Sequence, residues 1–268
     1  MATPIGNLGD MSLRGAETLR RAHLIAAEDK RVTAKLLNHL KIKVPLIAYN
    51  DHSDERLRDE LVARMADQAI ALVSDAGTPL ISDPGYKLVR AARAAGRFVT
   101  TLPGPCAAVA ALTLAGLPTD RFLFAGFLPP KAKARADAIA ELASVRASLI
   151  LYESGPRLGA ALAALAAGLG NREAAVAREI SKLFEEVVPG RLSALAARYA
   201  DAGPKGEIVI IVGPPEAAEQ PVANADAIDA ALIAAMAAMP VAKAAKQVAA
   251  MLGIDRHDAY RRAVVLKP

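Results

Sequence analysis

The sequence lacks tryptophan, has few aromatic residues of any kind (4%) and contains a single cysteine. That cysteine, Cys106, excludes an internal disulfide framework and a cysteine-based zinc site. The four histidines are scattered without the spacing of metal ligands, so we predict no metal site. No apolar run reaches the roughly 18 to 20 residues of a membrane span, and we expect no signal peptide, no membrane association and a cytoplasmic location.

Two phosphate-binding motifs are missing as well. A triphosphate-binding loop reads GxxxxGKS or GxxxxGKT, and a dinucleotide-binding fold carries GxGxxG where a helix begins. Neither pattern occurs in the chain. We therefore expect any small ligand to be bound without a loop that grips phosphate groups.

What the sequence does have is an excess of basic residues and an aliphatic composition. Its formal net charge is +5 and its pI is about 9.4, which favours an anionic partner but also suits a merely solvated basic surface. With 53% hydrophobic residues and so few aromatics, the core must be built from Ala, Leu, Val and Ile.

Short apolar runs rich in Val and Ile alternate with stretches of helical composition. Such alternation is typical of α/β architecture. We expect strands at 24–27, 45–49, 69–74, 97–102, 148–152, 174–178 and 208–212, and helices at 12–21, 32–40, 54–66, 86–95, 107–115, 133–143, 157–167 and 192–199.

The segment 117–130 has three prolines and no clear periodicity, which indicates a domain linker that contains a short strand. We therefore predict two α/β domains, at 1–114 and 115–214, with a cofactor cleft between them. The Pro-, Ala- and Glu-rich stretch 215–225 has the composition of a second linker.

A small helical unit is expected at 226–268. Its helices are predicted at 226–239, 240–252 and 256–266, and the last two meet at a glycine, as in a helix-turn-helix. The last helix is basic. A cap that packs on the rest of the protein and a nucleic-acid-binding unit both account for this pattern.

Two turns carry the most distinctive sequence. SDAGTP (74–79) directly follows an apolar stretch at 68–73, and LPGPC (102–106) directly follows another expected strand. Small residues let the backbone approach a ligand, and Pro and Gly fix the bend. Because ligands of open α/β sheets bind at the carboxyl ends of strands, we expect both turns to line the cleft.

The amino terminus departs from this arrangement. TPIGNLGD (3–10) has the composition of a third such turn, followed by Ser12 as a helix N-cap. A ligand loop of this kind hangs from a buried strand of about five to six residues. Only Met1 and Ala2 precede it here. We expect that the natural protein has an apolar upstream extension, lost through a misassigned start or a truncation.

Several runs together resemble a known family. They are TPIGNLGD (3–10), AAEDKR (26–31), VSDAGTPLISDPGY (73–86), LPGPCAA (102–108), GLPTDRF (116–122), GFLP (126–129), YES (152–154), ARE (177–179) and KGE (205–207). With these runs the sequence resembles the ribosomal RNA small subunit methyltransferase I family, which belongs to the tetrapyrrole methylase-like, class III methyltransferases. The resemblance spans nearly the whole chain, and the missing first strand is its departure from the family.

The resemblance implies an activity and its partners. The activity is 2′-O-methylation of a cytidine in the decoding region of 16S ribosomal RNA, either free or in the assembled small ribosomal subunit. The cofactor is S-adenosylmethionine, bound in the cleft between the two α/β domains of a homodimer. Two rival classes stay open, a methyltransferase of a tetrapyrrole precursor and a non-catalytic RNA-binding protein. The basic tail disfavours the first, and the number of cleft turns disfavours the second.

Carried over residue by residue, the resemblance also implies a cofactor site. Its residues are Pro4, Ile5, Gly77, Thr78, Ile81, Cys106, Ala107 and Tyr152. At one of them, Thr78, the broader fold has an acidic residue.

Methyl transfer needs alignment of the reacting atoms and help with the loss of a proton. The carboxylates Asp75, Glu153 and Glu179 stand at strand ends, with Lys182 one turn further, and each is a candidate catalytic residue, Asp75 first. For each of them, a role as a hydrogen-bond anchor for its loop is the favoured alternative, because carboxylates at turns commonly bond nearby backbone amides. Cys106 suggests a thiolate nucleophile, but no cationic neighbour in the sequence would activate it, and we expect a compact turn residue there.

Basic residues are expected to contact RNA in two places, although a solvated helix start accounts for the first of them equally well. The candidates are Lys131, Lys133 and Arg135 after the GFLP run, and Arg256, Arg261 and Arg262 in the helical tail.

Overall fold

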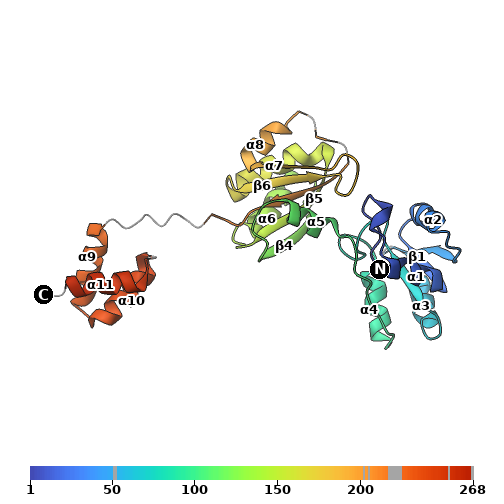
Figure 1. Ribbon diagram of the computed structural model, residues 1–268, viewed down its shortest axis with the longest axis horizontal. Helices are drawn as coiled ribbons and strands as arrows, with labels where there is room; N and C mark the ends of the chain where they lie inside the picture. The colour runs from blue at the N-terminus through green and yellow to red at the C-terminus, as the bar shows by residue number, and fades with distance from the viewer. Residues whose placement is uncertain (51–52, 202, 205, 217–224, 253, 267–268) are drawn as a thin grey trace. The chain divides into compact units, whose positions relative to one another are not determined.

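A computed structural model describes residues 1–50, 53–201, 203–204, 206–216, 225–252 and 254–266 (Figure 1). The chain divides into two compact units, Met1–Pro214 and Pro215–Pro268. None of the helices in the described ranges is long and apolar enough to cross a lipid bilayer.

The first sheet of the larger unit has three parallel strands in the order β2-β1-β3. The central strand β1 is buried on both faces, as expected of a parallel sheet that is covered by helices on both sides. Helices α1 and α2 pack on one face and α3 and α4 on the other. The elements are α1 (Leu13–Arg21), β1 (Leu24–Ala27), α2 (Lys30–His39), β2 (Leu46–Ala48), α3 (Glu55–Arg64), β3 (Ile70–Val73) and α4 (Tyr86–Ala94), preceded by the short 3₁₀ helix η1 (Leu8–Asp10).

Helices α1 and α2 begin at conventional side-chain caps. The side chain of Ser12 accepts a hydrogen bond from the Gly15 amide, and that of Asp29 from the Arg31 amide. Each cap satisfies a backbone donor that the helix itself leaves without a partner. The cap at Asp29 also fixes where the chain turns after β1, which matters for the site below.

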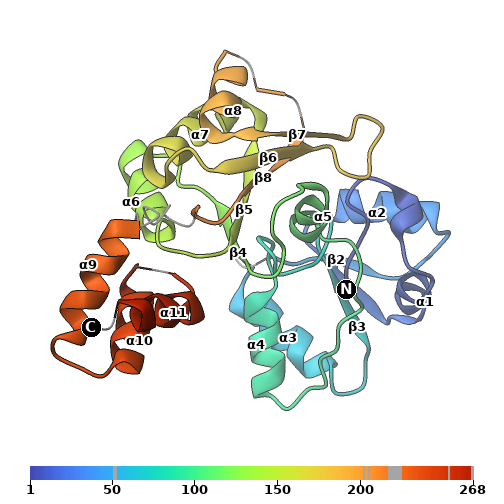
Figure 2. The same cartoon turned by 60° about the vertical axis from the view of Figure 1, so that its left-hand side comes forward.

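The second sheet has five strands in the order β4-β5-β8-β6-β7. Strands β4 and β5 are parallel, and the other pairs are antiparallel. Helices α6, α7 and α8 cover one face and α5 covers the other, as Figure 2 shows for α7 and α8. The elements are α5 (Ala107–Leu114), β4 (Phe122–Phe127), α6 (Ala132–Leu142), β5 (Ser148–Ser154), α7 (Gly155–Leu169), β6 (Glu173–Arg178), β7 (Glu186–Arg191), α8 (Leu192–Arg198) and β8 (Glu207–Val212).

The smaller unit consists of three helices, α9 (Ala225–Met236), α10 (Val241–Leu252) and α11 (Arg256–Val265), packed on one another (Figure 1). Its core is made largely of alanine, with Leu232 and Val248 as the larger buried side chains. The expected turn at residue 253 and most of the expected linker 215–225 lie outside the described residues.

The α/β alternation predicted from the sequence is confirmed, with two differences. The strand expected at 97–102 does not form, because the neighbouring segment Ala2–Thr3 gives it a hydrogen bond at Leu102 only and no ladder. Strand β7 was not expected, whereas the short strand expected within 117–130 is present as β4. Helix α5 packs on the second sheet, and the domain division at residue 114 stays a prediction.

Candidate active site

The three unusual turns form one assembly. Thr3 pairs with Gly77 through two backbone hydrogen bonds, of 2.9 and 3.1 Å. The Ala2 amide donates to the carbonyl of Leu102 at 3.2 Å, and the Thr78 hydroxyl donates to the carbonyl of Pro105 at 3.0 Å. The turns around residues 3, 77 and 104 therefore hold one another, although they are far apart in the sequence. The upstream extension that we expect before Thr3 stays a prediction.

These turns form one wall of a cavity of about 380 Å³, within the usual size range for small-molecule sites. The opposite wall comes from the ends of β4 and β5 and the start of β8. The predicted cofactor residues that line it are Ile5, Gly77, Thr78, Ile81, Cys106, Ala107 and Tyr152. Pro4 is not among the lining residues. The structure thus brings together all but one of the residues that the resemblance assigned to the cofactor.

Gly77 is required at the centre of this wall. Its φ of +79° lies in the left-handed region, where a side chain is strained. A Cβ atom there would stand 3.3 Å from Cγ2 of Ile5 and 3.6 Å from the carbonyl oxygen of Pro105. Glycine at this position therefore lets the SDAGTP turn pack closely against Ile5 and Pro105 in the cavity wall.

Tyr152 is fixed in the opposite wall. Its ring contacts Phe124 and Phe127 edge to face, with centroids 4.9 and 5.6 Å away. Its hydroxyl accepts a hydrogen bond from the Ala108 amide at 3.2 Å, in the first turn of α5. Burial raises the pKa of Tyr152 to about 12, so the phenol stays neutral at physiological pH. The cavity therefore has a rigid aromatic side.

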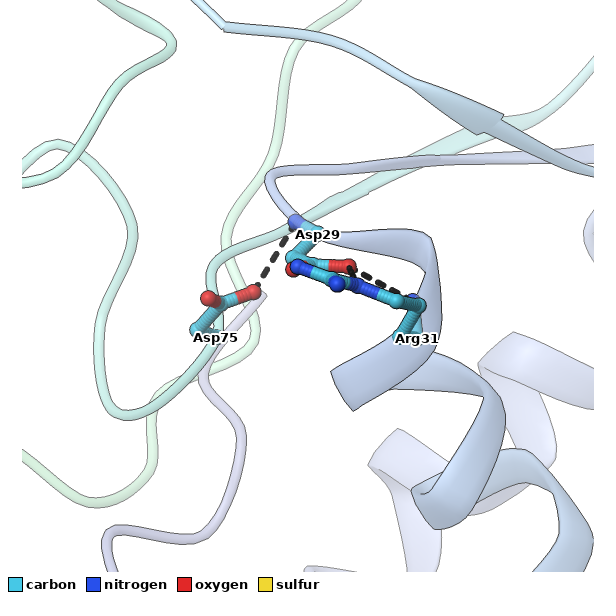
Figure 3. A network of polar contacts seen from close by, with 3 residues as sticks. All are labelled: Asp29, Arg31 and Asp75. Carbon is cyan, nitrogen blue, oxygen red and sulfur yellow. Dashed lines mark hydrogen bonds and ion pairs between the residues drawn. The ribbon is translucent and has the colours of Figure 1, made fainter.

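Asp75 lines the cavity, but its carboxylate is engaged with the backbone. Its Oδ1 accepts a hydrogen bond from the Asp29 amide at 2.9 Å (Figure 3). In return, Oε2 of Glu28 accepts a hydrogen bond from the Asp75 amide at 3.3 Å. The Asp29 carboxylate is itself held by Arg31, whose hydrogen bonds lower the pKa of Asp29 to about 2. Asp75 thus has the anchoring role that its position at a turn also suggested.

Glu153 is among the residues that line the cavity, but one of its carboxylate oxygens is bound at the start of α7. Side chains alternate along β5, and Ile150 and Tyr152 belong to the α5 side of the sheet. Glu153 therefore points to the side of α7, where its Oε1 accepts hydrogen bonds from the Ser154 amide at 2.8 Å and pairs with Nε of Arg157 at 3.2 Å. Its side chain is almost fully buried. This geometry favours a structural role at the start of α7 over a catalytic one.

Glu179 and Lys182 pair with each other at the rim. Nζ of Lys182 lies 3.0 Å from Oε1 of Glu179 and 3.3 Å from Oε2 of Glu207. The hydrogen bond from Lys182 lowers the pKa of Glu179. Glu207 lines the cavity, whereas Glu179 and Lys182 are not among its lining residues. The stem of Lys182 packs over Gly6, so this pair ties the second sheet to the TPIGN turn.

Sequence reasoning missed the carboxylates of Glu28, Asp83 and Glu207, which all line the cavity. Burial raises the pKa of Asp83 to about 6, and the nearby charges of Glu28, Asp75 and Glu207 add to the effect, against a hydrogen bond from Ser74. Burial also raises the pKa of Glu28. In the sequence, Asp83 could have been found from the SDPG run (82–85), a second turn-like run that directly follows SDAGTPLI.

The lining is acidic and, in the described part of the chain, contains no Lys, Arg or His. An anionic ligand group such as a phosphate would therefore be repelled, whereas a cationic group would be favoured. No group of three or more described His, Cys, Asp or Glu residues is arranged to hold a metal ion. The charge pattern agrees with the absence of phosphate-binding motifs from the sequence.

The expected RNA-binding residues lie at two separate places. Lys131 and Lys133 are exposed and Arg135 is partly buried at the start of α6, which follows β4. The last residue of β4 is Phe127 in the cavity wall. Lys133 pairs with Asp137 at 2.7 Å. This basic stretch therefore begins a few residues from the site.

The basic residues of the tail differ from one another. Arg262 pairs with Asp229 across α11 and α9 and donates to the Ala225 carbonyl at 3.0 Å, which makes it a clamp inside the unit. Arg261 pairs with Asp258 on its own helix, and Arg256 is exposed. The three-residue RNA contact expected here stays a prediction, and the structure gives Arg262 a structural role.

Comparison with known proteins first defines the class. Two family models match the chain, "Tetrapyrrole (Corrin/Porphyrin) Methylases" over residues 2–196 and "RsmI C-terminal HTH domain" over residues 222–267. A uroporphyrin-III-C-methyltransferase from Thermus thermophilus is similar with a TM-score of 0.56 and 21% identity, over 79% of this chain and 91% of its own. Diphthine synthase is similar with a TM-score of 0.61 and 18% identity, over 78% and 87%. The larger unit therefore has the tetrapyrrole methylase fold.

Relatives identify the family within that fold. Proteins named ribosomal RNA small subunit methyltransferase I are 56% identical in Erythrobacter litoralis (100% of this chain, 94% of the relative) and 48% identical in Mesorhizobium japonicum (100% and 91%). The one from Escherichia coli O157:H7 is 44% identical over 98% of this chain and 92% of its own. The chain belongs to the ribosomal RNA small subunit methyltransferase I family, which confirms the resemblance seen in the sequence.

Proposed function

We propose that the protein transfers a methyl group from S-adenosylmethionine to the 2′-oxygen of a cytidine ribose in the decoding region of 16S ribosomal RNA. The observation that carries the proposal is the acidic cavity at the meeting point of the three turns, in a chain of this methyltransferase family. A cytoplasmic homodimer that acts on the RNA or on the assembled small subunit is part of the same proposal.

The residues present fit this cofactor. S-adenosylmethionine carries positive sulfonium and ammonium groups and no phosphate. The described lining offers carboxylates and no cation, and the rings of Tyr152 and Phe127 offer an apolar surface for a flat base. Each property suits a cationic nucleoside better than a nucleotide.

The bound cofactor supplies an activated methyl group, so the protein has little covalent chemistry to perform. Its residues must bind and orient the two reactants in line and keep water out, which accounts for a large part of the rate gain in such reactions. The rigid contacts from Thr78 to Pro105 and from Ala108 to Tyr152 keep the two walls in place for this purpose. A carboxylate in the cavity wall would receive the proton of the acceptor hydroxyl.

Substrate binding is assigned to the basic surface beside the cavity. We propose that Lys131, Lys133 and Arg135 hold the RNA backbone, with additional contact from the helical unit through Arg256. Replacing the three residues of α6 by Ala should weaken RNA binding and lower its salt dependence, because fewer phosphates are neutralised. The matched control replaces Arg14, Arg20 and Arg21 of α1, which should leave both quantities unchanged. Cofactor affinity should not change in either variant.

The deciding experiment offers labelled S-adenosylmethionine with three acceptors. These are deproteinised small-subunit RNA, assembled small subunits that lack the methyl group, and a tetrapyrrole precursor. Transfer to either form of the RNA supports the proposal and shows which form is the substrate. Transfer to the tetrapyrrole alone contradicts it, and so does cofactor binding without transfer to any RNA.

A further inference from the structure

Asp83 lies on a loop whose backbone is held in unusual conformations. In the segment between β3 and α4, Leu80 and Ser82 have φ angles of +73° and +62°, although neither is glycine, and Gly85 has +124°. Such conformations cost free energy and persist where the surrounding structure imposes them, most often at functional sites. The loop leaves Ile81 exposed at the cavity and Asp83 half-buried in its wall.

The other carboxylates of the cavity have structural partners. Asp75 accepts the Asp29 amide, and Glu28 accepts the Asp75 amide. Glu153 is turned toward α7 and paired with Arg157. Glu207 is paired with Lys182 at the rim.

Asp83 differs from these residues because it forms no ion pair within the described structure. The buried residue Ser74, directly after β3, lies near it and donates its hydroxyl to the carbonyl oxygens of Ala76 and Gly77 at 3.3 and 3.4 Å. The charged groups that face it are carboxylates, namely Glu28 after β1, Asp75 after β3 and Glu207 at the start of β8. Across the cavity, it also acts electrostatically on the Tyr152 hydroxyl of β5. Asp83 is therefore a desolvated carboxylate inside the cavity without a cationic partner in the described structure.

We propose that Asp83 is the proton acceptor for the ribose hydroxyl that becomes methylated. The inference rests on the proposed function. The O–H bond of the hydroxyl breaks and its proton moves to a carboxylate oxygen of Asp83. The ribose oxygen uses the released electron pair to bond the methyl carbon. The electron pair of the broken carbon–sulfur bond stays on the sulfur, which becomes a neutral thioether, and Asp83 later releases the proton to solvent.

The proton affinity of Asp83 suits this step. Its pKa of about 6 leaves the group ionised at neutral pH while making it a stronger base than an ordinary aspartate. The three surrounding carboxylates repel its negative charge, so accepting a proton relieves that repulsion.

The test compares Asp83→Asn with a matched control, Asp67→Asn, which removes an exposed carboxylate in the turn before β3. Single-turnover transfer to unmethylated small subunits is measured from about pH 5 to about pH 8. The wild-type rate should rise with pH and level off above an apparent pKa of about 6. Asp83→Asn should be at least about 100-fold slower, and its rate should no longer rise with pH in this range. Asp67→Asn should follow the wild type. An Asp83→Asn rate within about threefold of wild type, or a flat wild-type profile, overturns the proposal.

Two readouts besides activity accompany the rates. Calorimetry should give Asp83→Asn a cofactor affinity at most about tenfold lower than that of wild type, well short of its loss in rate, because the remaining carboxylates of the cavity still favour the cationic cofactor. Carboxyl signals of ¹³C-labelled aspartate should show one group that titrates near pH 6 and disappears in Asp83→Asn. If no such group titrates, the proposal is wrong.

The outcomes also separate this proposal from the proposed function. A wild-type protein that methylates no RNA refutes both, whereas an active wild type with an unaffected Asp83→Asn variant refutes only the role of Asp83. If Asp83→Asn does not fold, the wild-type pH profile and the aspartate titration still decide the question. Asp83→Glu then serves as the second variant. Its transfer rate should still rise with pH, with a different apparent pKa.

Discussion

The Asp75 carboxylate accepts a hydrogen bond from the backbone amide of Asp29 at 2.9 Å, between the ends of two neighbouring strands (Figure 3). Glu28 returns the contact by accepting the Asp75 amide at 3.3 Å. Two turns that are far apart in the sequence are thereby fastened at the cavity wall. The SDAGTP motif has an aspartate at this position for a reason that does not require it to take part in the reaction.

Removal of the Asp75 carboxylate should therefore cost stability. Asp75→Ala leaves the Asp29 amide without a partner, and we expect a loss of about 1 to 3 kcal/mol in the free energy of unfolding. Asp75→Asn keeps an acceptor oxygen and should lose less than about half of that. Urea unfolding of both variants checks this. Equal losses of stability in the two variants would show that the charge of Asp75 matters rather than the hydrogen bond. Asp75 would then again be a candidate for the catalytic base.

Tyr152 should act through its ring more than through its hydroxyl. Tyr152→Phe removes the acceptor for the Ala108 amide and should cost about 1 kcal/mol of stability. The contacts with Phe124 and Phe127 remain, so cofactor affinity should stay within about threefold of wild type. Tyr152→Ala removes both and should bind the cofactor at least about tenfold more weakly. Calorimetry that finds the Phe variant as weak as the Ala variant would contradict this account.

Asp83 should make the protein less stable as pH rises. Its folded pKa of about 6 lies above the unfolded value of about 3.9, so the folded state binds the proton more tightly. The stability that this provides is fully present below about pH 4 and is lost as pH rises through about 6.

Asp83→Asn should accordingly gain stability relative to wild type between about pH 4 and about pH 8. The gain should be about 1 kcal/mol after allowance for solvent screening of a half-exposed group. Urea midpoints of both proteins at the two pH values give the difference. A constant difference at both pH values would show that the pKa of Asp83 does not change on folding.

In the helical unit, replacing Arg262 should affect stability, whereas replacing Arg256 should affect RNA binding. Arg262→Ala breaks the pair with Asp229, so amide exchange in α9 and α11 of the full chain should accelerate. Asp229→Asn should have the same effect because it breaks the same pair. Arg256→Ala should leave exchange unchanged and weaken RNA binding. Faster exchange in Arg256→Ala, or unchanged exchange in Arg262→Ala, would reverse these assignments.

Local composition was enough to predict most helices and strands, but not β7. This strand contains Pro189 and Gly190, which disfavour a strand wherever both neighbours must be paired. It forms because β7 is an edge strand that pairs with β6 alone. The segment 97–102 failed for the opposite reason, since its β-branched residues have no ladder partner in the described structure.

Site residues that lie in turns of distinctive sequence could be predicted. Those that only tertiary packing brings to the cavity could not. Gly77 and Thr78 belong to a turn whose sequence indicates a ligand. Glu153 and Tyr152 both line the cavity, and only the folded structure shows that the Ser154 amide and Arg157 hold the Glu153 carboxylate. The pKa of Asp83 is raised by burial and by carboxylates that three separate strands bring near it, and no local sequence pattern reveals either cause.

The position of the transferred methyl group tests the central claim most directly. Unmethylated small subunits are incubated with the protein and labelled S-adenosylmethionine, and the RNA is then digested to nucleosides and analysed by mass spectrometry. We predict one labelled nucleoside, 2′-O-methylcytidine, from a linkage in the decoding region that resists alkaline cleavage because its 2′-oxygen is blocked. Label on a base, on a ribose other than that of cytidine, or outside the decoding region would contradict the account.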